Sequence, residues 1–328
     1  MEKEKRMRVG IVATGWIAEK AVITLKGLET CEAYAVGSRS PERAEAFARK
    51  WGIPKACGSY AELIADPDVD LVYVATPHSH HFEVTRAALL AGKPCLVEKA
   101  FMANSREARE VIDLARSRRV FLAEAIWTRY QPAREIVRNL LAAGRIGTPR
   151  LITATLGYSM GDKPRIMRPD LCGGALLDLG VYALNFVRMF TDAEVALIDG
   201  HCVKSATGMD LTNAITMVLQ DGVLANVQSS ASCVGDNIGV IAGSEGNLII
   251  DNINNPQRIR VNTRDREFVE EIRVPQQITG YEYQFEACRQ ALLEGLLEPR
   301  EMPLDETLRI MQWMDDLRRK WDVRYPMD

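Results

Sequence analysis

Short apolar runs alternate with helical patterns through the first part of the chain. Runs rich in β-branched residues predict strands at residues 8–13, 32–37, 71–75, 96–97 and 120–123. Apolar positions at helical spacing predict helices at residues 41–51, 59–65, 81–91 and 104–117. Ser40, Ser59 and Asn104 stand where the N-caps of three of these helices belong. Strands and helices in this alternation predict a parallel, doubly wound α/β sheet.

The pattern changes near residue 124, after which strand-like alternation dominates. Strands are predicted at residues 151–158, 195–203, 213–219, 223–230, 237–250 and 258–263, and helices at residues 133–143, 175–190, 281–294 and 304–321. Asp221 and Gly222 between two alternating runs indicate a hairpin. We therefore expect one domain at residues 1–123. At residues 124–328 we expect a second, α+β domain with a large, mostly antiparallel sheet and both C-terminal helices.

Composition places the chain among ordinary soluble proteins. Its 328 residues suggest two domains, and a content of 47% hydrophobic and 26% charged residues can build sizeable cores. A net charge of −3 gives no electrostatic reason to expect nucleic acid or an anionic membrane as a partner. The seven cysteines are scattered, without C-x-x-C spacing, as in a reduced, cytoplasmic protein. Residues 1–6 lack the apolar core of a secretory signal, and no apolar run approaches the roughly 20 residues of a transmembrane helix.

The turn after the first strand is a degenerate dinucleotide-binding motif. Residues 13–18 are Ala-Thr-Gly-Trp-Ile-Ala, so Gly15 and Ala18 match the second and third positions of G-x-G-x-x-G/A, while Ala13 replaces the first glycine. Such a glycine lets the backbone approach a pyrophosphate at a helix N-terminus, where free N–H groups attract anions. A plain tight turn is the alternative. The place of the motif in the first strand-to-helix turn favours a dinucleotide site.

The end of the second strand favours NADP over NAD. NAD sites usually place a carboxylate there to bind the ribose 2′-hydroxyl. Here the strand continues into Ser38-Arg39-Ser40, without a carboxylate at its tip, and Arg43 follows. Guanidinium groups and hydroxyls suit a 2′-phosphate. The alternative is that Arg39 is a solvated loop residue and Ser40 only caps a helix.

Three of the four histidines, His78, His80 and His81, lie in one loop after a predicted strand. The H-x-H spacing is typical of zinc sites, but such sites need three or four ligands. Only His201 remains elsewhere, and no cysteine or carboxylate stands close at ligand spacing. We therefore expect no metal, and we expect the loop to lie near a nicotinamide or ribose.

Glu98 and Lys99 end the predicted strand at residues 96–97. In α/β sheets, ligands bind beyond the carboxyl ends of the strands, so this pair is a candidate part of the site. A solvated ion pair is the alternative, because exposed pairs of this kind are common and contribute little stability.

Several motifs, in order over nearly the whole chain, resemble one enzyme family. They are residues 13–18, Ala75-Thr76-Pro77-x-x-x-His81, Gly92-Lys93-Pro94-x-x-x-Glu98-Lys99, Glu124-Ala-Ile-Trp127-Thr-Arg129-Tyr130 and Gly173-Gly174-Ala-Leu-Leu-Asp178-Leu-Gly180-x-Tyr182. As a set they resemble the glucose–fructose oxidoreductase/inositol dehydrogenase family, and within it the dihydrodiol dehydrogenase branch. Three positions depart from the usual family pattern. Ala100 replaces a proline, which leaves the turn less rigid; His78 replaces an asparagine; and Tyr182 replaces a histidine, although the dihydrodiol branch also has tyrosine.

The resemblance implies an N-terminal Rossmann domain and a C-terminal domain whose open sheet forms a dimer or a dimer of dimers. It also implies an NAD(P)-dependent dehydrogenase or reductase that transfers a hydride between nicotinamide and a hydroxyl or carbonyl of a small sugar, polyol or cyclic trans-diol. The expected cofactor contacts are Ala13, Thr14, Gly15, Trp16, Ile17, Ser38, Arg39, Arg43, Ala75, Thr76, Pro77, His78, His81, Glu98 and Lys99. The alternatives are a redox-neutral, nicotinamide-dependent glycosidase, a non-catalytic NADP-binding sensor and, least favoured because of the histidine count, a metal-dependent hydrolase.

By the same resemblance, Lys99 is the catalytic lysine, and Asp178 and Tyr182 face it from the second domain. The latter two are four residues apart, so they share one face if residues 177–186 are helical. A free tyrosine, with a pKa of about 10, is a poor base at neutral pH, and a neighbouring ammonium group lowers that pKa. We expect Tyr182 to be the acid/base, Lys99 its electrostatic partner and Asp178 the orienting group. The alternative makes Lys99 the acid/base itself.

Four further residues are candidate substrate contacts: Trp127, Arg129, Tyr158 and Arg165. An indole face stacks on sugar or aromatic rings, and arginine pairs with hydroxyl clusters or carboxylates. For each of them taken alone, a packing role or a surface ion pair is the alternative.

Overall fold

The computed structural model describes residues 6–265 and 267–328, which form two compact units. Unit 1 extends to Tyr130 and includes Gln277–Met311, whereas unit 2 consists of Gln131–Gln276 and Gln312–Asp328. The expected boundary after residue 123, between a cofactor-binding domain and a substrate-binding domain, stays a prediction. The expectation that residues 1–6 hold no secretory signal concerns residues that, up to residue 5, lie outside the described part of the chain.

Unit 1 is built on a six-stranded parallel sheet with the order β3-β2-β1-β4-β5-β6. Its strands are β1 (Met7–Val12), β2 (Cys31–Gly37), β3 (Lys55–Cys57), β4 (Leu71–Val74), β5 (Cys95–Glu98) and β6 (Leu122–Ala125). This order confirms the predicted doubly wound fold, although the short strand β3 was not predicted. The strand order reverses between β1 and β4, and ligands of such sheets bind at the carboxyl ends beside this reversal.

Helices connect the strands of unit 1. They are α1 (Trp16–Lys26), α2 (Pro41–Trp51), α3 (Tyr60–Ala65), η1 (His78–His80), α4 (His81–Leu90) and α5 (Ser105–Arg118). Helices α2 to α5 lie at the predicted places, whereas no bounds were predicted for α1 and the short helix η1 was not predicted. The side chains of Ser40, Ser59 and Asn104 accept backbone N–H groups at three N-termini, as expected for N-caps. Three later elements, η2 (Trp127–Arg129), α9 (Glu282–Leu293) and the first part of α10 (Leu304–Trp321), also belong to unit 1.

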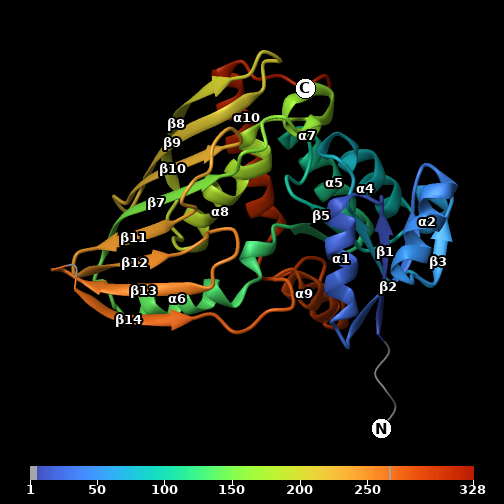
Figure 1. The fold of residues 1–328 in the computed structure, drawn as a ribbon, viewed down its shortest axis with the longest axis horizontal. Helices are drawn as coiled ribbons and strands as arrows, with labels where there is room; N and C mark the ends of the chain where they lie inside the picture. Colours follow the sequence, from blue (N-terminus) through green and yellow to red (C-terminus); the bar gives the residue numbers. More distant parts are fainter. Residues whose placement is uncertain (1–5, 266) are drawn as a thin grey trace, which may run out of the picture. The chain divides into compact units, whose positions relative to one another are not determined.

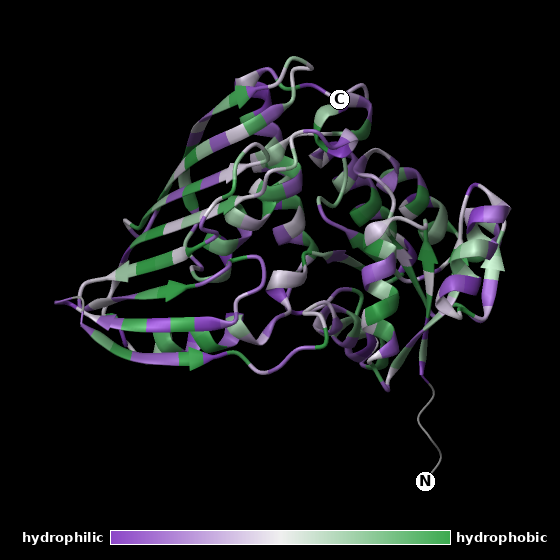
Figure 2. Ribbon diagram, viewed as in Figure 1, coloured by the Kyte–Doolittle hydropathy of each residue, from purple (hydrophilic) through white to green (hydrophobic). Residues whose placement is uncertain are grey.

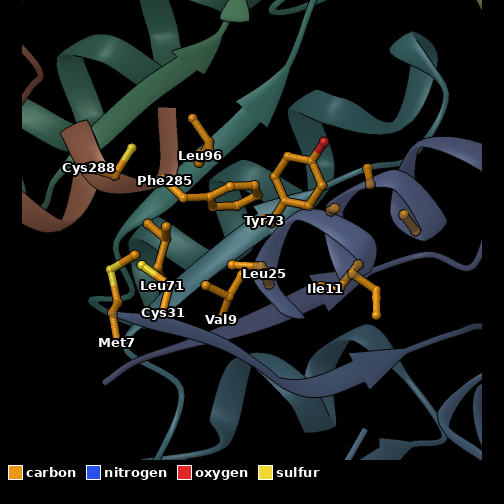
Figure 3. Close-up of a cluster of buried hydrophobic side chains, with 14 of the residues drawn as sticks. Met7, Val9, Ile11, Leu25, Cys31, Leu71, Tyr73, Leu96, Phe285 and Cys288 are labelled. Carbon is orange, nitrogen blue, oxygen red and sulfur yellow. The ribbon is translucent and has the colours of Figure 1, made fainter. Parts of the chain in front are cut away.

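The core of unit 1 joins residues from both ends of the chain (Figure 3). The side chains of β1, β4 and β5 pack against α1, and α9 adds Phe285 and Cys288. The ring of Phe285 meets that of Tyr73 edge to face, with 5.4 Å between the ring centres. Burial of these apolar side chains therefore fixes a C-terminal helix to the N-terminal sheet.

Unit 2 contains an eight-stranded sheet with the order β14-β13-β12-β11-β7-β10-β9-β8 (Figure 1). Its strands are β7 (Pro149–Gly157), β8 (Val195–Lys204), β9 (Asp210–Leu219), β10 (Leu224–Ser230), β11 (Gly239–Gly243), β12 (Gly246–Ile250), β13 (Arg258–Thr263) and β14 (Phe268–Arg273). Only β7 and β10 pair in parallel, so the sheet is mostly antiparallel, as predicted. The single predicted strand at residues 237–250 is two strands, and β14 was not predicted.

The strands of this sheet alternate between polar and apolar residues, as Figure 2 shows. Along β9, for example, buried positions recur at every second residue from Asn213 to Leu219. Such alternation is expected when one face of a sheet is packed and the other is open. The packed face carries the helices η4 (Leu176–Gly180) and α8 (Val181–Met189). The remaining helices of unit 2 are α6 (Pro132–Ala142), α7 (Pro164–Met167), η3 (Pro169–Leu171) and the last part of α10.

The stretch Pro169–Met189 corrects one expectation from the sequence. Its 21 residues include an 18-residue window with a mean hydropathy of 1.3, so the stretch is long and apolar enough to cross a membrane. However, 89% of that window is buried within the protein, which is typical of a core helix.

Candidate active site

The turn between β1 and α1 has the backbone of a dinucleotide-binding loop. Ala13, which replaces the first glycine of the motif, has a positive φ of 90°, a conformation that glycine adopts more easily. Its N–H donates to the carbonyl oxygen of Gly37 at 2.9 Å, which ties the turn to the end of β2. Gly15 then stands directly before α1, whose first N–H groups have no side-chain cap. The turn therefore offers anion-binding groups at a helix N-terminus.

Nothing within the protein requires glycine at residue 15. Its φ of −80° is open to any residue, and a Cβ added there would meet no protein atom within 4 Å. The residue is also exposed. A glycine is thus explained by close approach of a ligand to this backbone, and the turn fits the pyrophosphate of a dinucleotide. Ala18, at the third motif position, is fully buried, as close packing of the helix requires.

The residues expected at the 2′-phosphate follow β2. Ser38 is buried, and its hydroxyl accepts the N–H of Ser40 at 3.2 Å. Arg39 is exposed, with a guanidinium nitrogen 3.4 Å from Nε2 of His80. Arg43 is also exposed, in the first turn of α2. The structure therefore leaves two cationic side chains in solvent beside the carboxyl end of β2.

The loop after β4 is tied to the loop after β5 by two histidines. Nε2 of His78 lies 3.2 Å from the carbonyl oxygen of Lys99. The ring of His81 is fully buried between the two loops: Nε2 lies 2.9 Å from the carbonyl of Thr76, and Nδ1 lies 3.1 Å from those of Ala100 and Phe101. Burial lowers the pKa of His81 to about 3. We therefore assign His81 to positioning these loops, since no edge of its ring is exposed to a cofactor.

The remaining residues of this loop lie at the same edge of the sheet. Ala75 and Thr76 are buried at the end of β4, and Pro77 is exposed. The N–H of Ala75 donates to the carbonyl of Val12 at 3.1 Å, which holds the ends of β4 and β1 together. The structure thus brings the expected contacts of the β1 and β4 loops together within unit 1, although their contact with a cofactor stays a prediction.

Glu98 and Lys99 form the end of β5. The carboxylate of Glu98 is buried, accepts the hydroxyl of Tyr73 and accepts the N–H of Lys99 at 3.2 Å. Glu98 is therefore fixed from two sides and does not belong to a solvated ion pair. The peptide bond between Lys99 and Ala100 is cis.

The sequence assigned no role to the side chain of Glu124 in β6. This carboxyl group is 1% exposed, and its Oε2 accepts the hydroxyl of Thr307 at 2.9 Å. Burial raises its pKa to about 7, against the lowering effect of Thr307, Arg129 and Lys99. The signal that could have identified this residue from the sequence is a carboxylate within an apolar strand, but the strand was predicted to end at residue 123.

Two residues that were expected to contact the substrate contact other residues of unit 1. The indole of Trp127 stacks on the ring of Tyr281, with 4.0 Å between ring centres and 7° between planes. The guanidinium of Arg129 lies 3.3 Å from a carboxylate oxygen of Glu306, and this side chain is 3% exposed. The structure thus gives Arg129 an internal ion pair and does not favour a substrate contact for it.

Asp178 and Tyr182 lie on one continuous helix of unit 2, and both are buried. The first turn of this helix, η4, is a π-helix, which the sequence did not predict. Single π-turns of this kind are frequent at functional sites. Four residues apart on a continuous helix, the two side chains lie close to one helix face, as expected.

Arg165 is paired with Asp178 in unit 2. Its Nε lies 3.3 Å from Oδ2 of Asp178, while the arginine side chain is 53% exposed. The structure therefore brings together one expected catalytic and one expected substrate-binding residue. Tyr158, which follows β7, is partly buried, and its N–H donates to the carbonyl of Ser230 at 3.0 Å.

Residues 6–265 and 267–328, which the structure describes, contain no group of three or more histidine, cysteine, aspartate or glutamate side chains placed to hold a metal ion.

Comparisons with known proteins extend over nearly the whole chain. Residues 7–125 match the model of the oxidoreductase family with an NAD-binding Rossmann fold, and residues 135–249 match its C-terminal domain. Trans-1,2-dihydrobenzene-1,2-diol dehydrogenase from Mus musculus is 35% identical over 98% of this chain and 99% of the relative, and the Danio rerio enzyme is 34% identical with the same coverage.

Among solved structures, KijD10, a 3-ketoreductase from Actinomadura kijaniata in complex with NADP and TDP-benzene, is similar with a TM-score of 0.84. It is 26% identical, and the match covers 96% of this chain and 98% of that one. The loop geometry of unit 1 and these matches agree. The chain therefore belongs to the oxidoreductase family with an NAD-binding Rossmann fold, and it is an NAD(P)-dependent oxidoreductase.

Proposed function

We propose that this enzyme is an NADP-dependent dehydrogenase that oxidises a hydroxyl group of a cyclic trans-diol or a small sugar. The observation that carries this proposal is the similarity, over 98% of the chain, to trans-1,2-dihydrobenzene-1,2-diol dehydrogenases. The buried Asp178 and Tyr182 on one helix support it, because acid/base groups of this kind serve hydride transfer at an alcohol.

The cofactor supplies a hydride acceptor, and the protein moves the proton. Tyr182 takes the hydroxyl proton of the substrate, and Lys99 provides the positive charge that favours the phenolate. Asp178, itself fixed by Arg165, orients the substrate hydroxyl or the lysine. In the alternative assignment, Lys99 is the acid/base and Tyr182 donates a hydrogen bond.

The preference for NADP rests on the end of β2. Arg39 and Arg43 are exposed cations there, and Ser38 is the residue that directly follows the strand. A 2′-phosphate gains charge-assisted hydrogen bonds from such groups, whereas the 2′-hydroxyl of NAD does not. KijD10 binds NADP, which agrees with this choice.

The test is a panel of trans-diols, aldoses and inositols, each assayed with both cofactors at the absorbance of the reduced nicotinamide. We expect kcat/KM to be greatest for a trans-diol with NADP. Comparable kcat/KM values for NAD and NADP would contradict the cofactor assignment. Absence of turnover with every diol and sugar would contradict the substrate class.

We also propose that the enzyme is a cytoplasmic dimer formed through the open face of the eight-stranded sheet. Large apolar side chains are exposed on this sheet, at Leu151, Leu197, Val203 and Leu224. Leu151 and Leu224 lie opposite each other in paired strands, and neighbouring exposed apolar side chains are typical of interfaces between proteins. All seven cysteines are free thiols, as a reducing compartment requires. Light scattering of the purified protein tests the dimer, and a monomer mass would contradict it.

A further inference from the structure

A buried aspartate lies at the start of the helix that carries Asp178 and Tyr182. Asp210 is the first residue of β9, and its side chain is fully buried. Oδ2 accepts the backbone N–H of Leu176, the first residue of η4, at 2.7 Å. The first N–H groups of a helix have no partners within the helix, so a carboxylate at this point accepts one of them. Its negative charge also interacts favourably with the positive end of the helix dipole.

A second polar layer orients this aspartate. The side-chain amide of Asn213 donates to Oδ2 of Asp210 at 2.9 Å, and the hydroxyl of Ser229 on β10 donates to the amide oxygen of Asn213 at 2.8 Å. Asn213 and Ser229 are directly opposite each other in the paired strands. Because an ionised carboxylate only accepts hydrogen bonds, the NH₂ group of Asn213 points toward Asp210, and its amide oxygen is left to accept from Ser229.

Two glycines of the Gly-rich motif make room for this arrangement. A Cβ on Gly174 would lie 2.2 Å from Oδ1 of Asp210, and a Cβ on Gly180 would lie 3.1 Å from the hydroxyl of Ser229. The φ of Gly174 is also positive, at 114°. These glycines let the first turns of the helix approach β9 and β10 closely enough for Asp210 to reach Leu176.

We propose that Asp210 is a positioning residue whose ionised carboxylate fixes the π-turn carrying Asp178 and thereby sets the placement of Asp178 and Tyr182. This role rests on the proposed dehydrogenase function of those two residues. Asp210 lies on β9 and contacts the backbone of the helix at Leu176. We assign it no contact with the substrate.

The charge on Asp210 can change near neutral pH. Burial raises its pKa to about 6, while Asn213, the N–H of Leu176 and Arg318 oppose this rise. The other ionisable groups around it are Arg318 on α10, Tyr325 near the C-terminus and Cys202 on β8. Burial raises the pKa of Tyr325 and of Cys202, so both side chains stay neutral between about pH 5 and pH 8. The pKa of Arg318 is also raised, so its guanidinium stays cationic over this range. Asp210 is then the member of this set that titrates.

The test compares Asp210→Asn with the wild-type enzyme and with Asp199→Asn, a matched change at an exposed aspartate on β8 of the same sheet. We expect Asp210→Asn to lower kcat roughly 10-fold, to leave the Kd for NADP unchanged, and to abolish an acid limb of kcat near pH 6. Asp199→Asn should leave all three unchanged. Wild-type kcat together with a retained acid limb in Asp210→Asn would overturn the proposal.

Hydrogen exchange of residues 173–182 gives a readout that needs no turnover. After correction for intrinsic rates, the wild-type segment should lose protection as the pH falls through about 6, and Asp210→Asn should lack protection throughout. If Asp210→Asn does not fold, Ser229→Ala, which only frees Asn213, should show the same change to a smaller extent. Equal protection in all proteins would overturn the role of Asp210, whereas absence of wild-type turnover alone would overturn the proposed function.

Discussion

The two units hold their site residues in opposite ways. Unit 1 presents them on turns at the carboxyl ends of parallel strands, where backbone groups such as those of Gly15 lie exposed. Unit 2 presents Asp178 and Tyr182 on a buried helix whose first turn is fixed by the side chain of Asp210. Open backbone suits a cofactor recognised largely through its phosphates, and fixed side chains suit proton transfer. This difference predicts that substitutions in the turns after β1 and β2 of unit 1 act mainly on cofactor binding, and that those at Asp178 and Tyr182 in unit 2 act mainly on kcat.

The largest effect is expected at Tyr182. Tyr182→Phe removes the hydroxyl group that exchanges the proton, so kcat should fall by about 10² to 10⁴ while the Kd for NADP is unchanged. Steady-state kinetics and fluorescence titration of NADP measure the two quantities. A kcat near the wild-type value would exclude Tyr182 as the acid/base and leave Lys99→Met as the variant that should abolish turnover.

Gly15→Ala should weaken NADP binding roughly 10-fold or more, because its methyl group stands where the pyrophosphate approaches. The melting temperature should not change, since the new Cβ meets no protein atom within 4 Å.

Gly10→Ala is the matched control for Gly15→Ala. There the Cβ would lie 2.9 Å from side-chain carbons of Leu63 and Val69, so the free energy of unfolding should fall by about 1–3 kcal/mol. If Gly15→Ala instead destabilised the protein and left the Kd for NADP unaltered, the turn would be a structural feature without a cofactor.

Arg39→Ala tests cofactor choice with a smaller expected effect. Loss of one charge-assisted hydrogen bond to the 2′-phosphate should raise the KM for NADP about 10-fold and leave the KM for NAD unchanged. The ratio of kcat/KM for the two cofactors measures the change. Equal losses for NADP and NAD would show that Arg39 does not bind the 2′-phosphate.

Glu124→Gln should change the pH dependence of stability. The pKa of Glu124 is about 7 in the folded protein, above its ordinary value of 4.5, so the folded state binds the extra proton between these values. The wild type therefore loses stability as the pH rises from about 4.5 to 7, and Gln removes this loss while its oxygen still accepts from Thr307.

Urea unfolding near pH 5 and pH 8 measures this effect. Relative to wild type, Glu124→Gln should gain about 1 kcal/mol or more at the higher pH than at the lower. Glu110, which belongs to an exposed ion pair, supplies the control, because Glu110→Gln should give no such difference in stability between the two pH values. The same gain in both variants would contradict a buried, proton-binding Glu124.

The sequence predicted features that depend on neighbouring residues. The caps at Ser40, Ser59 and Asn104 and the Asp221-Gly222 hairpin need only local chemistry, and the structure confirms them. The doubly wound order followed from the alternation of strands and helices.

Features that depend on distant partners were not predicted. Strand β6 was placed two residues early because Glu124 looked like a strand end, whereas Thr307 on α10 makes its burial possible. Strand β14 is an exposed edge strand with the sequence Phe-Val-Glu-Glu-Ile-Arg, in which apolar and polar residues do not alternate, so it gives no two-residue period. The π-turn at Leu176–Gly180 depends on Asp210, which lies 34 positions away in the chain.

The stoichiometry of oxidation tests the central claim most directly. Purified wild-type enzyme is incubated with NADP and a cyclic trans-diol, and the NADPH formed is compared with the diol consumed. Hydride transfer predicts one NADPH for each diol oxidised. Consumption of substrate without any change in NADPH absorbance, or no consumption of any diol or sugar in the panel, would contradict the account.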